Sequence, residues 1–261
     1  MRVLKLTLQY DGTELVGWQR QKSGDSVQGL LEAALSRIDG VDVAVHGAGR
    51  TDAGVHAVAQ VASAHVASDL DTRTLRRAIN AHLPPSVRVT SVEDAAPDFH
   101  ARFSATGKTY RYLILERDVA SPFLWRYVWP VPGVLDVDRM QAAAAALVGS
   151  HDFSAFQSTG STVSHAVRVV TAASVRVWTD GMPPPVPVAL AGDAGRLVVF
   201  EVTASGFLRH MVRALAGTLV EIGLDRRPPG TMSALLGGRV RADAGPTAPA
   251  AGLWLVSVDY C

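Results

Sequence analysis

HGAGRTDAGVHA, at residues 46–57, places three glycines around a single carboxylate, that of Asp52. Gly47, Gly49 and Gly54 permit positive φ angles and let another backbone segment approach closely. Alternating valines just before the stretch predict a strand that runs directly into it. The sequence therefore predicts a loop at the end of a strand, a position from which a fold commonly presents one reactive side chain.

Asp52 has two interpretations from its neighbours alone. Arg50 lies two residues earlier and favours the ionised carboxylate, which in a cleft can act as a nucleophile or a base. Alternatively, Asp52 caps a turn by accepting hydrogen bonds from its own backbone. Both interpretations stay open at this level. A metal site made of His46, Asp52 and His56 is disfavoured, because their spacing matches no usual ligand pattern.

Motifs of several other enzyme classes do not occur in the chain. GAGRTD has Asp52 where a dinucleotide loop needs glycine, and a carboxylate there would repel a pyrophosphate. The sequence contains no GxxxxGK[ST] phosphate loop and no GxSxG nucleophile elbow. Its one cysteine, Cys261, excludes an internal disulfide and a zinc site built on cysteine pairs. A glycosidase would need a second carboxylate near Asp52, and the loop offers none.

Length and composition are those of a globular protein with a buried core. The 261 residues are 48% hydrophobic and 19% charged, with a formal net charge of +1. A charge so near zero attracts no polyanion globally, so any nucleic-acid surface must be a local cluster of Lys and Arg. The N-terminus lacks the apolar run of a signal peptide, and no window reaches about 18 uninterrupted apolar residues. We expect a cytoplasmic protein without a membrane span.

Periodicity divides the chain into two halves of mixed strands and helices. At the N-terminus Leu4, Leu6, Leu8 and Tyr10 alternate with polar residues, as in a half-buried strand. The first half continues with a helix over 26–39 capped by Ser26, strands over 41–45, 58–66 and 87–92, and a short helix capped by Asp71 or Thr72 that ends at Ala81. The second half has strands over 108–115, 166–179, 196–204 and 253–260, helices over 136–148 and 206–223, and a Pro- and Gly-rich loop over 180–195.

This order of elements predicts an α+β fold. We expect two ferredoxin-like-type α/β halves, residues 1–105 and 106–261, that share an extended, mostly antiparallel sheet with a central cleft. The N-terminal half would carry the loop of Asp52. The C-terminal half would carry the strand of Tyr110, the long helix and the C-terminal strand.

Five stretches of the sequence resemble the motifs of one known family. They are YDGTELVGWQRQ at 10–21, GRTDAGVHA at 49–57, HARFSATGKTYRY at 100–112, FLRHMVRALAGTLVEIG at 207–223 and GPTAPAAGLWLVSVDY at 245–260. In this order they resemble the tRNA pseudouridine synthase A family, with Gly245 in place of alanine as a minor departure. The resemblance runs from residue 10 to residue 260.

The resemblance implies a reaction that Asp52 starts. Uridine becomes pseudouridine at positions 38–40 in the anticodon stem-loop of tRNA: the glycosidic bond breaks, the base rotates while bound, and a C–C bond forms at C5. Nothing leaves the nucleotide except the proton of C5, so we expect neither a cofactor nor a metal. Three roles for Asp52 stay open, namely attack on the sugar, addition to the base, and removal of a ribose proton.

The resemblance also implies roles for other residues. Tyr110 would stack on the target base and help remove the C5 proton, Arg213 would be the basic partner of Asp52, and Leu253 would pack by the base. From the pattern alone, Tyr110 could instead be a core aromatic and Arg213 a solvent-facing charge.

RNA binding would depend on local basic residues. Arg50 would fill the gap left by the flipped base or bind a phosphate. The other candidates are Arg20, Lys22, Arg102, Lys108 and Arg111. The family acts on tRNA as a homodimer, and we expect the same partners here. The alternative function is a non-catalytic RNA-binding protein on the same scaffold.

Overall fold

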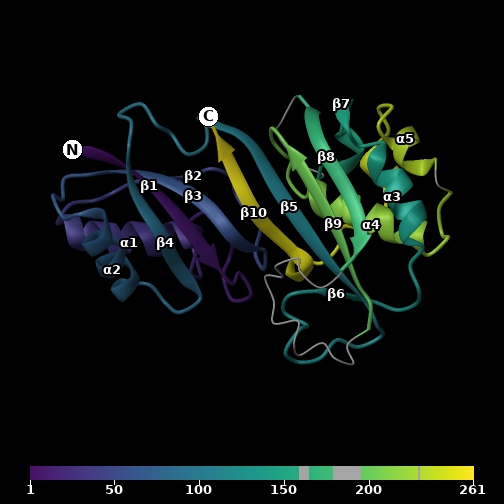
Figure 1. Cartoon of the computed structure of the whole chain (residues 1–261), viewed down its shortest axis with the longest axis horizontal. Coiled ribbons are helices and arrows are strands. Elements are labelled where there is room, and N and C mark those ends of the chain that lie inside the picture. Colours follow the sequence, from purple (N-terminus) through teal and green to yellow (C-terminus); the bar gives the residue numbers. More distant parts are fainter. Residues whose placement is uncertain (159–164, 179–194, 229) are drawn as a thin grey trace. The chain divides into compact units, whose positions relative to one another are not determined.

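The computed structural model describes residues 1–158, 165–178, 195–228 and 230–261 (Figure 1). The loop predicted over 180–195 lies outside these ranges except for its last residue. The chain forms two compact units, which are described in turn. None of the helices in the described ranges is both long and apolar enough to cross a membrane.

Unit 1 comprises Met1–Thr106 together with Trp254–Cys261. Residues 254–261 thus group with the first unit, whereas the sequence suggested the second half for them. The helices and strands of unit 1 are β1 (Arg2–Tyr10), α1 (Val27–Asp39), β2 (Val45–Gly47), β3 (His56–Val66), α2 (Thr72–His82), β4 (Val87–Ala95) and β10 (Leu253–Tyr260).

The sheet of unit 1 has the order β4-β1-β3-β10. Neighbouring strands run antiparallel except for β10, which pairs with the start of β3 in parallel, through His56 and Ala57. β2 pairs antiparallel with a later part of β3, through Ala62 to Ala64. β3 therefore pairs over short stretches with both β10 and β2. The polypeptide between β2 and β3 carries Asp52.

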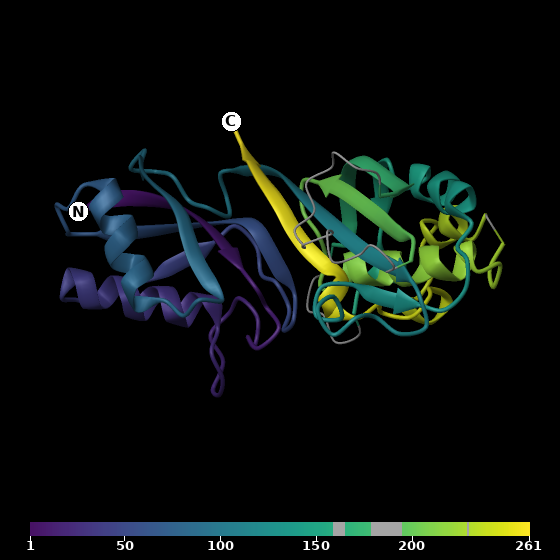
Figure 2. The same ribbon diagram turned by 60° about the horizontal axis from the view of Figure 1, so that its bottom comes forward.

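The alternation predicted for the N-terminal strand is confirmed by its burial. Leu4, Leu6 and Leu8 are fully buried in β1, and Tyr10 is nearly so. The predicted helix caps are also present: Ser26 Oγ accepts the N–H of Gly29 at the start of α1, and Asp71 accepts that of residue 74 at the start of α2. α1 and α2 pack against one another beside the sheet (Figure 2).

The strand predicted over 41–45 is wrong in its first part, because β2 begins only at Val45. Side chains of α1 accept hydrogen bonds from backbone N–H groups that would otherwise pair with a neighbouring strand. Val43 N–H donates to Ser36 Oγ at 2.8 Å, and Val45 N–H donates to Glu32 Oε1 at 3.1 Å. Of the alternating valines, Val43 and Val45 are buried and Val41 is exposed.

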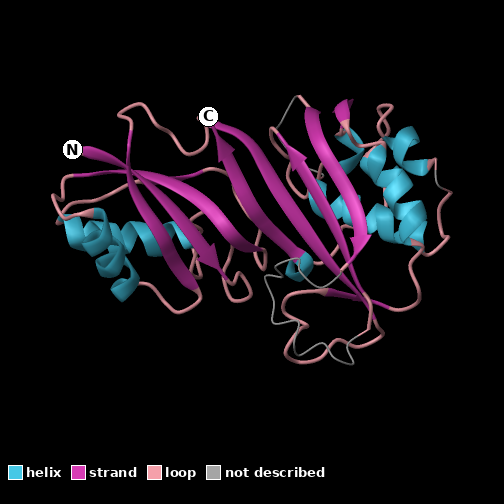
Figure 3. Ribbon diagram, in the orientation of Figure 1, coloured by secondary structure: helices cyan, strands magenta, loops and turns pink. Residues whose placement is uncertain are grey.

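Unit 2 comprises Gly107–Leu253. Its helices and strands are β5 (Ala105–Glu116), β6 (Trp129–Val131), α3 (Val137–Ala145), β7 (Gly149–Asp152), η1 (Ser154–Phe156), β8 (Val167–Val177), β9 (Leu197–Ala204), α4 (Met211–Gly223), α5 (Thr231–Leu235), η3 (Arg241–Asp243) and η4 (Ala250–Gly252). The strand order is β5-β9-β8-β7, all antiparallel, with β6 parallel to β5. α3, α4 and α5 gather beside these strands (Figure 3).

The long helix predicted over 206–223 begins later than expected, at Met211. Leu208 keeps the apolar spacing of the helix and is buried, but it does so from a turn, in which Met211 N–H donates to Leu208 O. His210 then adopts a left-handed backbone, with φ of 63°, which starts α4 sharply. Helical spacing alone could not reveal this turn.

The α+β class and the mostly antiparallel pairing predicted from the sequence are confirmed in both units. The sharing of a sheet between the halves and the central cleft remain predictions about how the units combine.

Candidate active site

Asp52 lies in the loop of residues 48–55, called the Asp52 loop below. Its side chain is partly exposed, while Thr51 beside it is buried. Ala48 N–H donates to Val61 O as the loop leaves β2, and Val55 N–H donates to Asp52 O in a closing turn. The carboxylate of Asp52 therefore projects from a short, hydrogen-bonded turn and not from a long irregular loop.

Two buried polar side chains outside the Asp52 loop, those of Tyr10 and Gln60, form hydrogen bonds with it, and Thr51 of the loop is buried with them. The Tyr10 hydroxyl is 2.8 Å from Thr51 Oγ1, and Gln60 Nε2 donates to that hydroxyl at 3.3 Å and to Gly49 O at 3.0 Å. All three side chains are at most 6% exposed. Burial raises the pKa of Tyr10 to about 12, against smaller opposing effects of its hydrogen bonds to Thr51 and Gln60. Tyr10 is thus a neutral hydrogen-bonding group at physiological pH.

Glycines in the stretch 10–21 meet the backbone of the Asp52 loop closely. Gly54 has a φ of 78°, which confirms one predicted left-handed position. Gly17 also has a positive φ, and a Cβ there would lie 2.7 Å from Thr51 O. A Cβ at Gly12 would lie 2.0 Å from Val55 O. The stretch 10–21 therefore packs directly against the Asp52 loop, which explains its glycines.

Neither Gly47 nor Gly49 has a positive φ, and Gly47 is required for a different, steric reason. A Cβ on Gly47 would lie 2.3 Å from Trp18 Cε2, so the indole ring occupies the space of a side chain. The backbone N–H of Trp18 also donates to Thr51 O at 3.0 Å. Trp18 is 3% exposed and contacts the chain at Gly47 and at Thr51, before and next to Asp52.

His56 follows the Asp52 loop and is completely buried. Its Nδ1 accepts the N–H of Gly12 at 3.1 Å and lies 3.2 Å from Asp11 Oδ1. Its ring stacks on Trp254 of β10, with centroids 4.3 Å apart. These contacts join His56 to the segment of Asp11 and Gly12 and to β10, so His56 has a structural role beside the loop.

Tyr110, Arg213 and Leu253 belong to unit 2. Tyr110 is 7% exposed on β5 and packs edge-on against Phe207, with ring centroids 5.0 Å apart. Tyr112 is fully buried, and its hydroxyl donates to Pro249 O at 2.6 Å. Tyr112 is thus a core residue, whereas Tyr110 lies at the edge of the core.

Arg213 is half-buried on α4 and exchanges hydrogen bonds with Ala248. Arg213 Nε donates to Ala248 O at 2.7 Å, and Ala248 N–H donates to Arg213 O at 3.1 Å. The guanidinium is therefore fixed against the segment 245–252, called the C-terminal segment below, which leads into Leu253. Leu253 itself is 6% exposed at the start of β10.

The C-terminal segment packs tightly on α4. A Cβ on Gly217 would lie 1.8 Å from Pro246 O, and a Cβ on Gly245 would lie 2.7 Å from Thr218 Cα. Gly245 N–H donates to Thr218 Oγ1 at 3.0 Å. Glycine at 245 therefore fits this chain closely, which accounts for its departure from the family pattern.

The candidate RNA-binding residues have different surroundings. Arg50 and Lys22 are exposed, and Arg20 is 67% exposed with its Nε 3.1 Å from Glu32 Oε2. Arg102 is exposed too, whereas Lys108 is 9% exposed.

Arg111 differs from the other candidates. Its guanidinium binds Glu201 across the strand pair β5–β9, through Nε at 2.8 Å and Nη2 at 2.6 Å. This ion pair stabilises the sheet of unit 2, so any contact of Arg111 with phosphate would compete with it.

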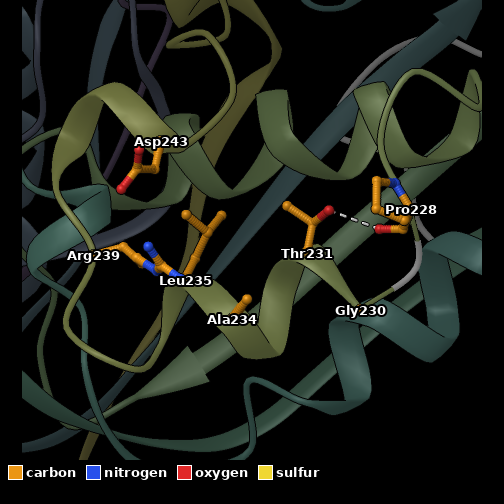
Figure 4. Close-up of a pocket in the computed structure, with 7 residues that line it drawn as sticks. All are labelled: Pro228, Gly230, Thr231, Ala234, Leu235, Arg239 and Asp243. Atoms are coloured by element: carbon orange, nitrogen blue, oxygen red, sulfur yellow. Dashed lines mark hydrogen bonds between the residues drawn. The ribbon is translucent and has the colours of Figure 1, made fainter.

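A pocket of about 350 Å³ lies around α5 in unit 2 (Figure 4). Thr231, Leu235 and Arg239 are among its lining residues, and Thr231 Oγ1 donates to Pro228 O at 2.7 Å. None of the site residues predicted from the sequence lines this pocket, so it has no role in the assignment of Asp52.

The supporting residues Tyr10, Gln60 and Trp18 were not predicted as part of the site. Gln60 offered a signal, because it is a long polar residue in a strand of small apolar ones. A polar side chain in such a strand needs a buried partner, and here the partner is the Asp52 loop.

The chain is similar over its whole length to proteins of one activity. The model of the tRNA pseudouridine synthase family matches residues 7–104 and 143–261. Three relatives carry the name tRNA pseudouridine synthase A. That of Syntrophotalea carbinolica is 42% identical over 100% of this chain and 97% of its own. Those of Myxococcus xanthus and Moorella thermoacetica are each 44% identical, over 98% and 100% of this chain and 91% and 100% of their own.

Proposed function

The chain belongs to the tRNA pseudouridine synthase family, and we propose that it isomerises uridine to pseudouridine at positions 38–40 in the anticodon stem-loop of tRNA. The observation that carries the proposal is the partly exposed carboxylate of Asp52 on a loop held by buried hydrogen bonds. A reacting group must be held in one geometry, and this loop supplies it.

Asp52 starts the reaction, in which atoms and electrons balance without a second substrate. The N1–C1′ bond breaks, the base rotates and the C5–C1′ bond forms; the C5 proton passes to solvent and N1 takes up a proton from solvent, so that the product is an isomer of the substrate. A carboxylate can begin this sequence by attack on C1′, by addition to C6 or by removal of a ribose proton. Each route needs an accessible carboxylate, and the partial exposure of Asp52 is consistent with all three.

The residues of unit 2 complete the proposed site. Tyr110, held edge-on by Phe207, stacks on the uracil and assists the loss of the C5 proton. Arg213, fixed on Ala248 O, pairs with Asp52, and Leu253 packs by the base. This part of the proposal requires the two units to bring both sets of residues to the same uridine.

RNA binding and assembly follow the same proposal. The uridine must leave its stack before it can react, and Arg50, exposed two residues before Asp52, fills the gap or binds the phosphate. Arg20, Lys22, Arg102, Lys108 and Arg111 are further proposed RNA contacts. We propose a cytoplasmic homodimer as the acting form.

The proposal is tested with unmodified tRNA transcript carrying tritium at uridine C5. The wild type is expected to release tritium into water, and Asp52→Asn to release it at least about 10³-fold more slowly. Asp42→Ala, which changes an exposed carboxylate shortly before β2, is the matched control and keeps full activity. Transcripts with single uridines at positions 38, 39 and 40 show which position reacts.

Two results would contradict the proposal. RNA binding without tritium release by the wild type would favour the non-catalytic RNA-binding function. Equal rates for the wild type and Asp52→Asn would remove Asp52 from the mechanism.

A further inference from the structure

Three aromatic rings lie in a continuous row on unit 1, called the stack below, in which the first pair is stacked and the second pair is tilted. The ring centroids of His46 and His100 are 5.0 Å apart at an interplanar angle of 28°. Those of His100 and Phe103 are 4.4 Å apart at 35°. The guanidinium carbon of Arg102 lies 5.6 Å from the Phe103 ring centroid. The stack thus combines π faces with a cation.

The outer members of this stack face solvent. Phe103 is 77% exposed, and Arg102 and His46 are also exposed. The immediate neighbours of Phe103 in the stack are cationic or polar rather than apolar. An apolar protein partner would favour a wider hydrophobic patch, whereas RNA offers stacking bases together with phosphates.

The turn of residues 100–104, called the stacking turn below, is ordered by its own hydrogen bonds. His100 Nδ1 accepts the N–H groups of Arg102 at 3.1 Å and Phe103 at 3.4 Å. His100 N–H donates to Ser104 Oγ, and Ser104 N–H donates back to His100 O. Phe103 is therefore held outward by a closed turn.

The stacking turn is anchored to the core of unit 1 by Ala101, which is fully buried. Ala101 N–H donates to Ser63 Oγ on β3 at 3.1 Å, and its carbonyl accepts the hydroxyl of Tyr260 on β10 at 2.7 Å. A rigid anchor lowers the entropy cost of using an exposed ring for binding.

His100 acts as a neutral surface within the stack. Its Nδ1 accepts two N–H groups, which requires that nitrogen to be unprotonated. Burial lowers the pKa of His100, and the nearby His46 and Arg102 lower it further. His100 thus contributes a neutral ring, and Arg102 contributes a guanidinium cation.

The stack is close to the Asp52 loop within the same unit. His46 belongs to β2, directly before that loop. Six residues of fully extended chain span at most roughly 20 Å, which limits the distance between the Cα atoms of His46 and Asp52. A nucleotide near the target uridine in the same stem-loop can lie in this range.

We propose that His46, Arg102 and Phe103 form a stacking platform for an unpaired base of the substrate RNA that flanks the target uridine. The base stacks on Phe103, and Arg102 binds the adjacent phosphate. This inference rests on the proposed function, because it takes the bound RNA to be the substrate.

The platform is tested by equilibrium binding of an anticodon stem-loop RNA that carries 2-aminopurine at one loop position at a time. Stacking quenches 2-aminopurine fluorescence. The wild type is expected to quench one position, and Phe103→Ala to abolish this quenching and raise Kd about tenfold. Phe103→Tyr retains both. Phe123→Ala, which changes a 67% exposed residue of unit 2, is the control and leaves both unchanged.

Salt dependence separates the ring from the cation. Arg102→Ala is expected to reduce the slope of log Kd against log salt by about one phosphate contact, whereas Phe103→Ala leaves the slope unchanged. Both residues are exposed, so thermal unfolding of both variants is expected to match that of the wild type.

The platform and the proposed reaction fail in different ways. A Kd for Phe103→Ala within twofold of the wild-type value, with quenching retained, overturns the platform whatever the tritium assay shows. Quenching that depends on Phe103, in a wild type that releases no tritium, supports the platform and overturns the proposed reaction.

Discussion

The Asp52 loop in unit 1 and the C-terminal segment in unit 2 are both fixed by hydrogen bonds, but the groups that fix them differ. Neutral buried side chains, those of Tyr10 and Gln60, hold the Asp52 loop. Arginines and a close helix contact hold the C-terminal segment.

The difference matters for function because the two kinds of support respond differently to change. Neutral buried hydrogen bonds are insensitive to salt, and they are costly to lose because a polar group is then left without a partner. Half-exposed arginine contacts are screened by salt and water. We therefore expect damage to the first support to lower both stability and kcat, and damage to the second, at residues outside the proposed site, to lower mainly stability.

The largest expected effect comes from Gly217→Ala, which tests the close contact of α4 with the C-terminal segment. The added Cβ would lie 1.8 Å from Pro246 O, so the helix and the segment must separate. We expect the free energy of unfolding to fall by about 3 kcal/mol in chemical denaturation. Gly230→Ala is the control, since a Cβ there meets nothing within 4 Å. Equal stability of the two variants would show that the contact is loose.

Gln60→Leu sharpens the comparison in unit 1. It leaves Gly49 O and the Tyr10 hydroxyl without this donor, and we expect a loss of about 2 kcal/mol in stability. We also expect kcat for tritium release to fall at least about tenfold, since Asp52 loses its fixed position.

The control for Gln60→Leu is Asn80→Leu. Asn80 likewise exchanges two hydrogen bonds with backbone, at Val89 N–H and O, but it joins α2 to β4. A similar loss of stability with unchanged kcat is expected. If both variants lose kcat equally, the support of the Asp52 loop has no special role in reactivity.

The local patterns that predicted β1 and α1 from the sequence are short-range. Alternation at Leu4, Leu6 and Leu8 needs only the two-residue period of a strand, and the Ser26 cap needs only a neighbouring amide. Both are confirmed. The start of α4 was missed, because Leu208 keeps helical spacing from within a turn.

The support of Asp52 could not be predicted, because it depends on contacts between distant residues. Tyr10 meets Thr51 only through the register of β1 on β3, in which Tyr10 lies opposite Ala57. The pairing of Arg111 with Glu201 likewise follows from the register of β5 on β9. The alternation within each strand does not by itself fix either register, because it leaves shifts of two residues open.

Tyr10→Phe is expected to lower the free energy of unfolding by a smaller amount. The pH dependence of this loss shows that it comes from the Tyr10 hydroxyl. Loss of the hydroxyl removes the contacts with Thr51 and Gln60 and costs about 1 kcal/mol near neutral pH. The folded pKa of Tyr10 is raised to about 12 from an unfolded value of 10.0. This stabilising contribution is therefore complete below pH 10 and is lost as the pH rises toward 12.

Denaturation of the wild type and Tyr10→Phe across pH 8–12 measures that contribution. The difference in stability between the two proteins should narrow above pH 10, since the other tyrosines titrate in both and cancel. A difference that stays constant to pH 12 would show that the Tyr10 hydroxyl is not desolvated.

Arg241→Ala is expected to have the smallest effect on stability. It tests the arginine contacts that hold the C-terminal segment in unit 2. Arg241 donates to Gly245 O at 2.8 Å and to Thr247 Oγ1 at 2.7 Å, from a half-buried position where water can replace it. We expect a loss of about 0.5–1 kcal/mol in stability, with kcat within about twofold of the wild type. Arg239→Ala, which changes an exposed arginine two residues earlier, should leave stability unchanged. A large loss of kcat in Arg241→Ala would mean that the C-terminal segment positions reacting groups as strictly as the Asp52 loop does.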